Sequence, residues 1–140
     1  MYQLHICQEF EASAARLFKA WTHPALMSRW LAPGDLKATE VSADTAIGGQ
    51  YRVVMEQPDG EQHIVTGHYI DVIENQKLVF SWQWQHAECA SRVELRFTAL
   101  SDTRCQLDLI HREFADEELR DKHQQGWEGC LSKLQQLLAQ

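Results

Sequence analysis

The stretch that decides the fold is FADEELRDKHQQGWEGCLSKLQQLL, residues 114–138. At about 100° per residue its apolar side chains gather in an arc of roughly 140°, so we expect one long amphipathic helix whose apolar face is buried. Asp116 is placed to cap the helix, and Glu117 and Glu118 put negative charge in the first turn, where the helix dipole favours it. The arc consists of Leu119, His123, Gly126, Trp127, Cys130, Leu131, Leu134, Leu137 and Leu138.

Gly126 stands on this arc although glycine costs about 1 kcal/mol relative to alanine inside a helix. A close approach between the helix and the sheet backbone would explain it, and we expect one there.

Ahead of the helix the hydrophobic pattern has a period of two, which predicts strands. The alternating stretches are 2–7, 36–43, 51–56, 62–73, 77–85, 92–97 and 105–112. Asp59-Gly60 is a hairpin turn signal, and Gly67 predicts a bulge or bend in its strand. Two short helices, at about 13–22 and 24–31, follow the first strand, and Pro24 separates them.

Clustered strands followed by a helix predict an α+β fold: a curved antiparallel sheet of six to seven strands around a long C-terminal helix, with two short helices after the first strand. A length of 140 residues suits a single domain, residues 1–140. A gap between sheet and helix, closed at one end by the short helices, is the natural place for a ligand.

The charge balance excludes some classes of partner. Against 13 Lys and Arg stand 20 Asp and Glu, and the net charge of −7 argues against nucleic acid or an anionic membrane surface. No apolar run reaches membrane-spanning length, so we expect no membrane insertion, and the N-terminus lacks a signal-peptide pattern. Four cysteines, 7, 89, 105 and 130, form no CxxC pair, so we expect free thiols in a cytoplasmic protein.

Motifs for catalysis or cofactors are missing. The chain has no HExxH and no paired Cys/His spacing, so we expect no metal, and without GxGxxG or a P-loop we expect no nucleotide cofactor. His111 and His123 are the polar groups predicted to face the gap. Each is either a hydrogen-bonded interior histidine, which we favour, or a group that orients the polar end of an apolar ligand.

Short motifs also run in order along nearly the whole chain. They are Phe10 to Phe18 with Trp21 and Trp30, the Gly48-Gly49-Gln50-Tyr51 turn, Gly67, Leu78-Val79-Phe80-Ser81-Trp82, His111 with Phe114, and His123 with Gly126-Trp127 and Leu131. As an ordered set they resemble the Hsp90-ATPase-activator-like (AHSA1-type) family of the START-like (SRPBCC) superfamily. The resemblance implies the helix-grip fold, also called Bet v 1-like, and a hydrophobic cavity between the sheet and the C-terminal helix.

The resemblance leaves the function open, because superfamily members carry lipids, bind other apolar ligands, cyclise polyketides or assist a chaperone. Co-chaperones that resemble this family have a separate N-terminal domain that supplies much of the chaperone contact. Here Met1 already opens the first predicted strand, so we expect chaperone contact to be the lesser alternative.

The sequence therefore predicts a protein that binds a small, mainly apolar ligand, and it favours a binding protein over an enzyme. One alternative is an Hsp90-type chaperone-associated interaction protein; another is a cyclase- or hydrolase-type enzyme that uses His111 or His123 as acid or base. Neither the ligand nor the oligomeric state follows from the sequence. The residues expected to line the cavity are Tyr51, Val53, Tyr69, Phe80, Trp82, Leu95, Leu109, His111, His123, Trp127 and Leu131.

Overall fold

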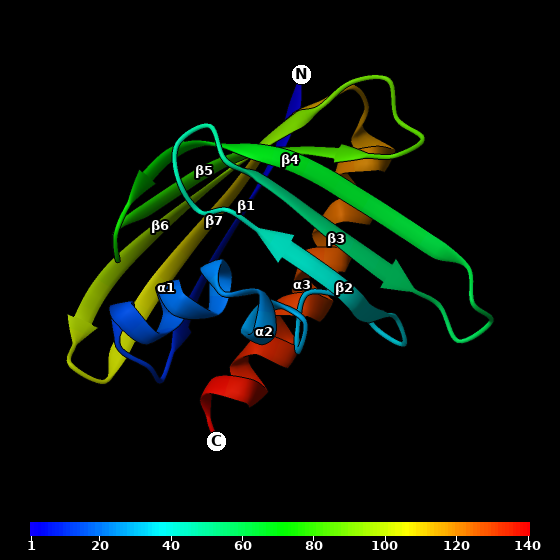
Figure 1. Ribbon diagram of the computed structural model, residues 1–140. Coiled ribbons are helices and arrows are strands. Elements are labelled where there is room, and N and C mark those ends of the chain that lie inside the picture. Colours follow the sequence, from blue (N-terminus) through cyan, green and yellow to red (C-terminus); the bar gives the residue numbers. More distant parts are fainter.

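A seven-stranded antiparallel sheet curves around one long helix in the computed structural model, which describes residues 1–140 (Figure 1). The strand order is β1-β7-β6-β5-β4-β3-β2, so β2 to β7 form a meander and β1 pairs with β7 at the far edge. This is the predicted α+β helix-grip architecture. The elements are β1 (Tyr2–Phe10), α1 (Ala14–Thr22), α2 (Pro24–Met27), β2 (Lys37–Ala43), β3 (Gln50–Glu56), β4 (Gln62–Ile73), β5 (Lys77–Trp84), β6 (Ser91–Ser101), β7 (Arg104–Phe114) and α3 (Glu117–Leu138).

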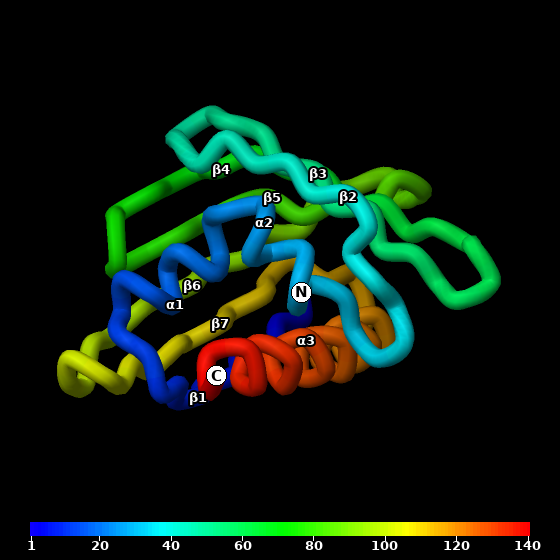
Figure 2. Tube along the Cα trace, turned by 60° about the horizontal axis from the view of Figure 1, so that its bottom comes forward, coloured from blue at the N-terminus to red at the C-terminus, as the bar shows by residue number.

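Helix α3 does not cover the whole sheet. It packs on β1 and β7, while α1 covers β6 and β7 and α2 lies beside β2. Figure 2 shows β2, β3 and β4 on the opposite side of the molecule from α3. The curved sheet and the helix therefore diverge toward β3 and β4, and this divergence positions the site described below.

The sequence pattern of α3 is confirmed except in its first turn. The Asp116 carboxylate accepts the Leu119 N–H at 2.7 Å, as expected of an N-cap. The prediction was wrong for Leu119, whose side chain is 40% exposed. The buried stripe begins further along, and its members are Trp127, Cys130, Leu131, Leu134 and Leu138.

The expected contact at Gly126 is also wrong. A Cβ built on Gly126 would lie 4.0 Å from its nearest neighbour, Cγ of Pro33, and no sheet atom comes closer. The tight position is Gly129, where a Cβ would lie 3.2 Å from Cβ of Pro33. The segment that comes close to α3 at these glycines is therefore the loop after α2, and not the sheet.

That loop is held by specific bonds. Helix α2 ends at Met27, earlier than the predicted residue 31, and the chain continues in hydrogen-bonded turns to Leu31. Within them the buried Trp30 donates its Nε1–H to the Ala20 carbonyl at 3.0 Å. Lys133 of α3 then donates to the carbonyls of Ala32 and Leu36, at 2.6 and 3.1 Å. The segment between them is thereby fixed against α3.

Gly67 does not mark a bulge. It pairs with Tyr51 in regular β3–β4 register, and the register shift of β4 lies further on, between Tyr69 and Asp71, where β4 meets β5. Gly67 is needed because the Tyr51 ring lies against it, with its hydroxyl donating to the Ser81 carbonyl at 2.5 Å. Tyr69 still faces the core and is 2% exposed.

Two further findings bear on the sequence predictions. None of the helices combines the length and the apolar character that crossing a membrane requires. All four cysteines are free thiols, of which Cys105 and Cys130 are buried and Cys7 and Cys89 exposed.

Candidate functional site

A cleft of about 580 Å³ opens where α3 and the sheet diverge. Its walls come from α3, from the ends of β3, β4 and β5, and from the loop after α2. Most of the lining is apolar, and four polar side chains stand among it. The lining residues, which define the apolar cleft, are Pro33, Leu36, Met55, Gln57, His63, Trp82, Trp84, Lys122, His123, Gly126, Trp127 and Cys130.

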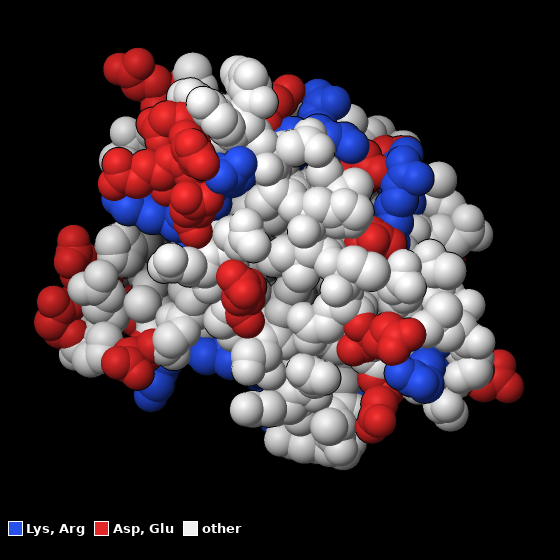
Figure 3. Space-filling model, turned by 180° about the vertical axis from the view of Figure 1, so that it is seen from behind, with Lys and Arg blue, Asp and Glu red and all other residues white.

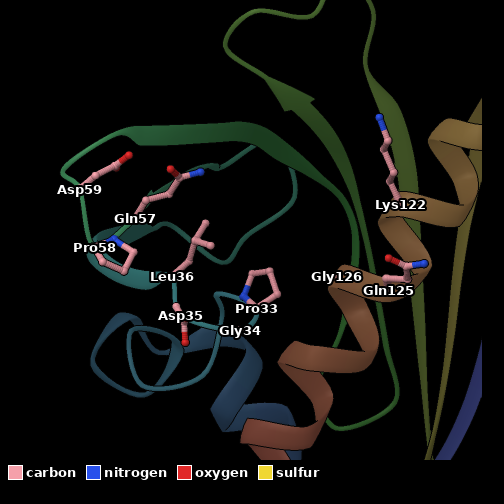
Figure 4. Close-up of a pocket in the computed structure, with 10 residues that line it drawn as sticks. All are labelled: Pro33, Gly34, Asp35, Leu36, Gln57, Pro58, Asp59, Lys122, Gln125 and Gly126. Atoms are coloured by element: carbon pink, nitrogen blue, oxygen red, sulfur yellow. The ribbon is translucent and has the colours of Figure 1, made fainter.

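A second, more open hollow of about 630 Å³ adjoins the apolar cleft and shares Pro33, Leu36, Gln57, Lys122 and Gly126 with it. We call it the outer vestibule. Figure 4 shows its three walls: the loop after α2, the β3–β4 turn and one face of α3. Half of its ten lining residues have polar side chains: Asp35, Gln57, Asp59, Lys122 and Gln125. The outer vestibule thus places polar groups directly beside the apolar cleft.

All five tryptophans of the chain form one continuous row beside the cleft. The order is Trp30, Trp21, Trp127, Trp82 and Trp84, with ring centroids 4.5, 5.8, 4.9 and 5.5 Å apart. The outer part of this row, from Trp127 to Trp84, lines the apolar cleft, with Trp127 and Trp82 buried and Trp84 half-buried. Large aromatic area of this kind suits a flat apolar ligand.

His111, on β7, is fully buried and bonded through both ring nitrogens. Trp127 Nε1–H donates to His111 Nδ1 at 3.0 Å, so Nδ1 carries no proton. Nε2 therefore carries the proton and donates to Ser91 Oγ at 2.6 Å. The Ser91 hydroxyl in turn donates to the Trp82 carbonyl at 3.2 Å. This chain of bonds joins α3 to β7, β6 and β5.

His123, on α3, has the opposite tautomer. Trp84 Nε1–H donates to His123 Nε2 at 2.9 Å, and His123 Nδ1–H donates to the Leu119 carbonyl at 2.8 Å. The two imidazole centroids are 5.3 Å apart. Each imidazole thus uses one nitrogen as acceptor and one as donor, and both are held neutral.

The surroundings favour the same charge state. Burial lowers the pKa of His111 well below its ordinary value, and the nearby His123 lowers it further. Burial also lowers the pKa of His123, against the opposing effect of its bond to the Leu119 carbonyl. Protonating either ring would break the bond that an indole N–H donates to it.

Mild acid is therefore expected to destabilise the fold. Below the ordinary pKa of 6.5 the unfolded chain binds protons that the folded chain excludes, so the free energy of unfolding is fully present above that pH and falls beneath it. For the fully buried His111, the free energy of unfolding should fall by up to about 1.4 kcal/mol for each pH unit below that value. Urea unfolding at a series of pH values from about 7 to about 5 measures it.

His111→Phe separates this effect from general instability. The variant leaves Trp127 Nε1 and Ser91 Oγ without their partner, so it should be less stable at every pH. Its slope below pH 6.5 should nevertheless be shallower than that of the unmodified protein. An equal slope in both proteins would contradict a neutral, buried His111.

The residues predicted to line the cavity fall into three groups. Trp82, His123 and Trp127 line the apolar cleft. Tyr51, Tyr69 and Phe80 meet Trp82 and Trp127 around a much smaller space of about 10 Å³, the inner void, which Trp21, Met27 and Leu31 complete. The others are core residues at most 1% exposed and do not border the apolar cleft: Val53, Leu95, Leu109, His111 and Leu131.

The apolar cleft lies nearer the ends of β3 and β5 than most of the predicted residues do. Met55 and Trp84 line the cleft, and each is the next inward-facing position after a residue that was predicted, Val53 and Trp82. Carrying the alternation one step further along β3 and β5 would have found them. Pro33 and Leu36 carry no such signal, because their loop is placed by Lys133 and Trp30.

Charge is distributed unevenly around the site. Figure 3 shows one face of the molecule, with acidic side chains gathered toward the end where α3 begins. That end includes Asp116, Glu117, Glu118 and Asp121. Lys122, the cation that lines the cleft, is exposed and lies 3.4 Å from Glu118. His, Cys, Asp and Glu side chains nowhere gather in a group of three that could hold a metal ion.

Comparison with known proteins agrees with this architecture. Residues 11–139 match the family described as Activator of Hsp90 ATPase homolog 1-like protein. The AHSA1 protein of Silicibacter pomeroyi is 28% identical over 99% of this chain and 98% of its own, with a TM-score of 0.85. A Rhodobacter sphaeroides protein is 25% identical over 98% of this chain and 92% of its own, with a TM-score of 0.86. A Chromobacterium violaceum protein, 18% identical over 97% and 96%, shares the fold with a TM-score of 0.89. Among curated proteins none matches.

Proposed function

The chain belongs to the Activator of Hsp90 ATPase homolog 1-like family, and from this premise we propose that it binds a small, mainly apolar molecule in the apolar cleft. The ordered motifs of the sequence predicted this family. The observation that carries the proposal is the cleft itself, walled by Trp82, Trp84 and Trp127 between helix and sheet. We further propose that the protein acts in the cytoplasm, where its free thiols would persist.

The dimensions and chemistry of the cleft support binding of a small molecule. Its volume of about 580 Å³ falls within the range of roughly 300–1,000 Å³ usual for such sites. The indole faces offer apolar contact, while His63 and Gln57, joined by a 2.8 Å hydrogen bond, stand at the β3–β4 side. An apolar ligand would displace water from these faces, so its binding should show a negative heat-capacity change.

The hydrogen bonds of the two central histidines favour binding over catalysis. A general base needs a nitrogen within reach of the substrate proton. In His111 and His123 every ring nitrogen already has a partner in the protein. We therefore assign both residues to positioning Trp127 and Trp84 in the cleft wall and propose no acid–base role for them.

Gly126→Leu tests the location of the site. Position 126 borders both the apolar cleft and the outer vestibule, and a side chain there has free space ahead of it. Leucine should fill part of the cleft and weaken binding of 2-ethylnaphthalene, a flat apolar probe, by at least about tenfold, measured by tryptophan fluorescence titration. Folding should not suffer, because replacing a helical glycine favours the helix by up to about 1 kcal/mol.

Gln136→Leu is the matched control, since it adds the same side chain to the exposed face of α3. Binding of the probe should be unchanged in this variant. Equal affinities for the unmodified protein and Gly126→Leu would place the site elsewhere.

The family description itself supports a second candidate, contact with an Hsp90-type chaperone. Such contact would use the outer sheet surface or loops and not the cleft. Co-sedimentation with a purified Hsp90-type chaperone, and its ATPase rate with and without this protein, test it. Binding that persists in Gly126→Leu would separate chaperone contact from ligand binding.

A further inference from the structure

Two buried indole N–H groups have no hydrogen-bond acceptor. Among buried side-chain nitrogen and oxygen atoms, Trp21 Nε1 and Trp82 Nε1 alone lack a partner. The other three indoles are bonded, Trp30 to the Ala20 carbonyl, Trp84 to His123 and Trp127 to His111. Since buried donors in proteins are nearly always paired, two unpaired ones in a single aromatic row point to an acceptor supplied from outside the chain.

The two rings that carry these donors line the same space. Trp21 and Trp82 are 3% and 5% exposed, and both line the inner void. Trp82 and Trp127 line the inner void and the apolar cleft alike. The cleft and the void therefore adjoin at these two rings, whose centroids are 4.9 Å apart.

The chemistry of the void favours one kind of acceptor. Its volume of about 10 Å³ is near the lower limit for a single water, which needs roughly two to four polar partners. A water could accept from the indoles, but its own hydrogens would then need acceptors, and among the side chains that line the void these would have to be the hydroxyls of Tyr51 and Tyr69. A carbonyl oxygen has two lone pairs and no hydrogen, so it would satisfy N–H donors without creating a new unpaired group.

The acceptor should also be uncharged. All eight residues that line the void are apolar or aromatic, and Lys122, the cation of the cleft, is not among them. A carboxylate placed there would be buried without a counter-ion, which is far costlier than burying a neutral carbonyl.

We propose that the ligand is a neutral carbonyl compound whose apolar body fills the cleft and whose oxygen accepts hydrogen bonds from Trp82 Nε1–H and Trp21 Nε1–H at the inner void. This rests on the proposed function and narrows the ligand class. It also gives Trp82 a role in specificity that its aromatic surface alone would not.

A matched pair of probes tests the inference. 2-Acetylnaphthalene and 2-ethylnaphthalene have nearly the same shape and differ by a carbonyl oxygen in place of two hydrogens. The unmodified protein should bind the ketone about tenfold more tightly than the hydrocarbon. In Trp82→Phe this ratio should fall to about one. The ratio is the readout because the smaller ring alters both affinities through lost apolar contact.

Trp30→Phe is the matched control. It removes an indole N–H that already has a partner, the Ala20 carbonyl, so in the folded variant the ratio should stay near ten. A second measurement needs no variant to fold: in ¹H–¹⁵N spectra of the unmodified protein, two indole signals should move downfield with the ketone and not with the hydrocarbon.

The possible failures are distinct. Equal binding of both probes, with no ketone-specific indole shift, overturns the carbonyl inference and leaves the cleft as the binding site. A water held in the void, detected as a long-lived cross-relaxation partner of the indole protons in the presence of saturating ketone, overturns it too. Binding of neither probe overturns both the carbonyl inference and the proposed function.

Discussion

Replacing Gly67 with alanine is expected to lower the free energy of unfolding by more than about 4 kcal/mol, beyond the usual range for a single substitution. A Cβ at this position would overlap the main-chain oxygen of Ser81 and lie 2.6 Å from Cε2 of Tyr51. The Tyr51 ring could yield only by giving up its bond to the Ser81 carbonyl and its place beside Tyr69 and Phe80. The β5 backbone cannot move without disturbing its pairing on both sides.

Gly126→Ala is the control, because the same change there meets no atom closer than 4.0 Å. It should be neutral or stabilise by up to about 1 kcal/mol. Urea unfolding of both variants gives the comparison. A Gly67→Ala protein within about 1 kcal/mol of the unmodified one would show that Tyr51 does not occupy the space over Gly67.

The second large effect is expected for Leu134→Ala. Leu134 is 0% exposed and sits in the middle of the buried stripe of α3, so truncation should cost about 2–5 kcal/mol through lost apolar contact and the cavity left behind. Ser132→Ala, on the exposed face of the same helix, should change stability by less than about 0.5 kcal/mol. Chemical denaturation measures both, and similar losses in the two variants would mean that α3 packs on a different face.

What the sequence predicted well was decided by local spacing. The 3.6-residue period and the Asp116 cap located α3, and the alternation from Gln62 to Ile73 gave the bounds of β4. These signals are repeated over many residues, and each neighbour reinforces them. The order of elements then left few topologies, and the antiparallel meander followed.

The errors came from interactions between distant segments. Helix α2 gives way after Met27 to turns in which Trp30 bonds to Ala20, ten residues away. Gly67 is required by the Ser81 carbonyl and the Tyr51 ring on the two neighbouring strands. The residues next to position 24 or 67 in the sequence give no indication of these distant contacts.

The position of the cleft was harder still to predict. An unfilled volume is what remains after every side chain has packed, so it depends on the whole core and not on any stretch. Inward-facing positions were identified, but Val53, Leu95 and Leu109 fill the centre of the sheet. The sequence favours a hydrogen-bonded, interior His111. It does not identify the partners, Trp127 and Ser91, because neither is near His111 in sequence.

The row of five tryptophans has an optical consequence. Indole rings whose centroids are 4.5 to 5.8 Å apart are close enough for their excited states to couple and for excitation to migrate from ring to ring. Because the row contains every tryptophan of the chain, the tryptophan fluorescence comes from all five coupled rings and not from one residue. A molecule that quenches Trp84 at the apolar cleft can thus also quench excitation that began on Trp30 at the far end of the row.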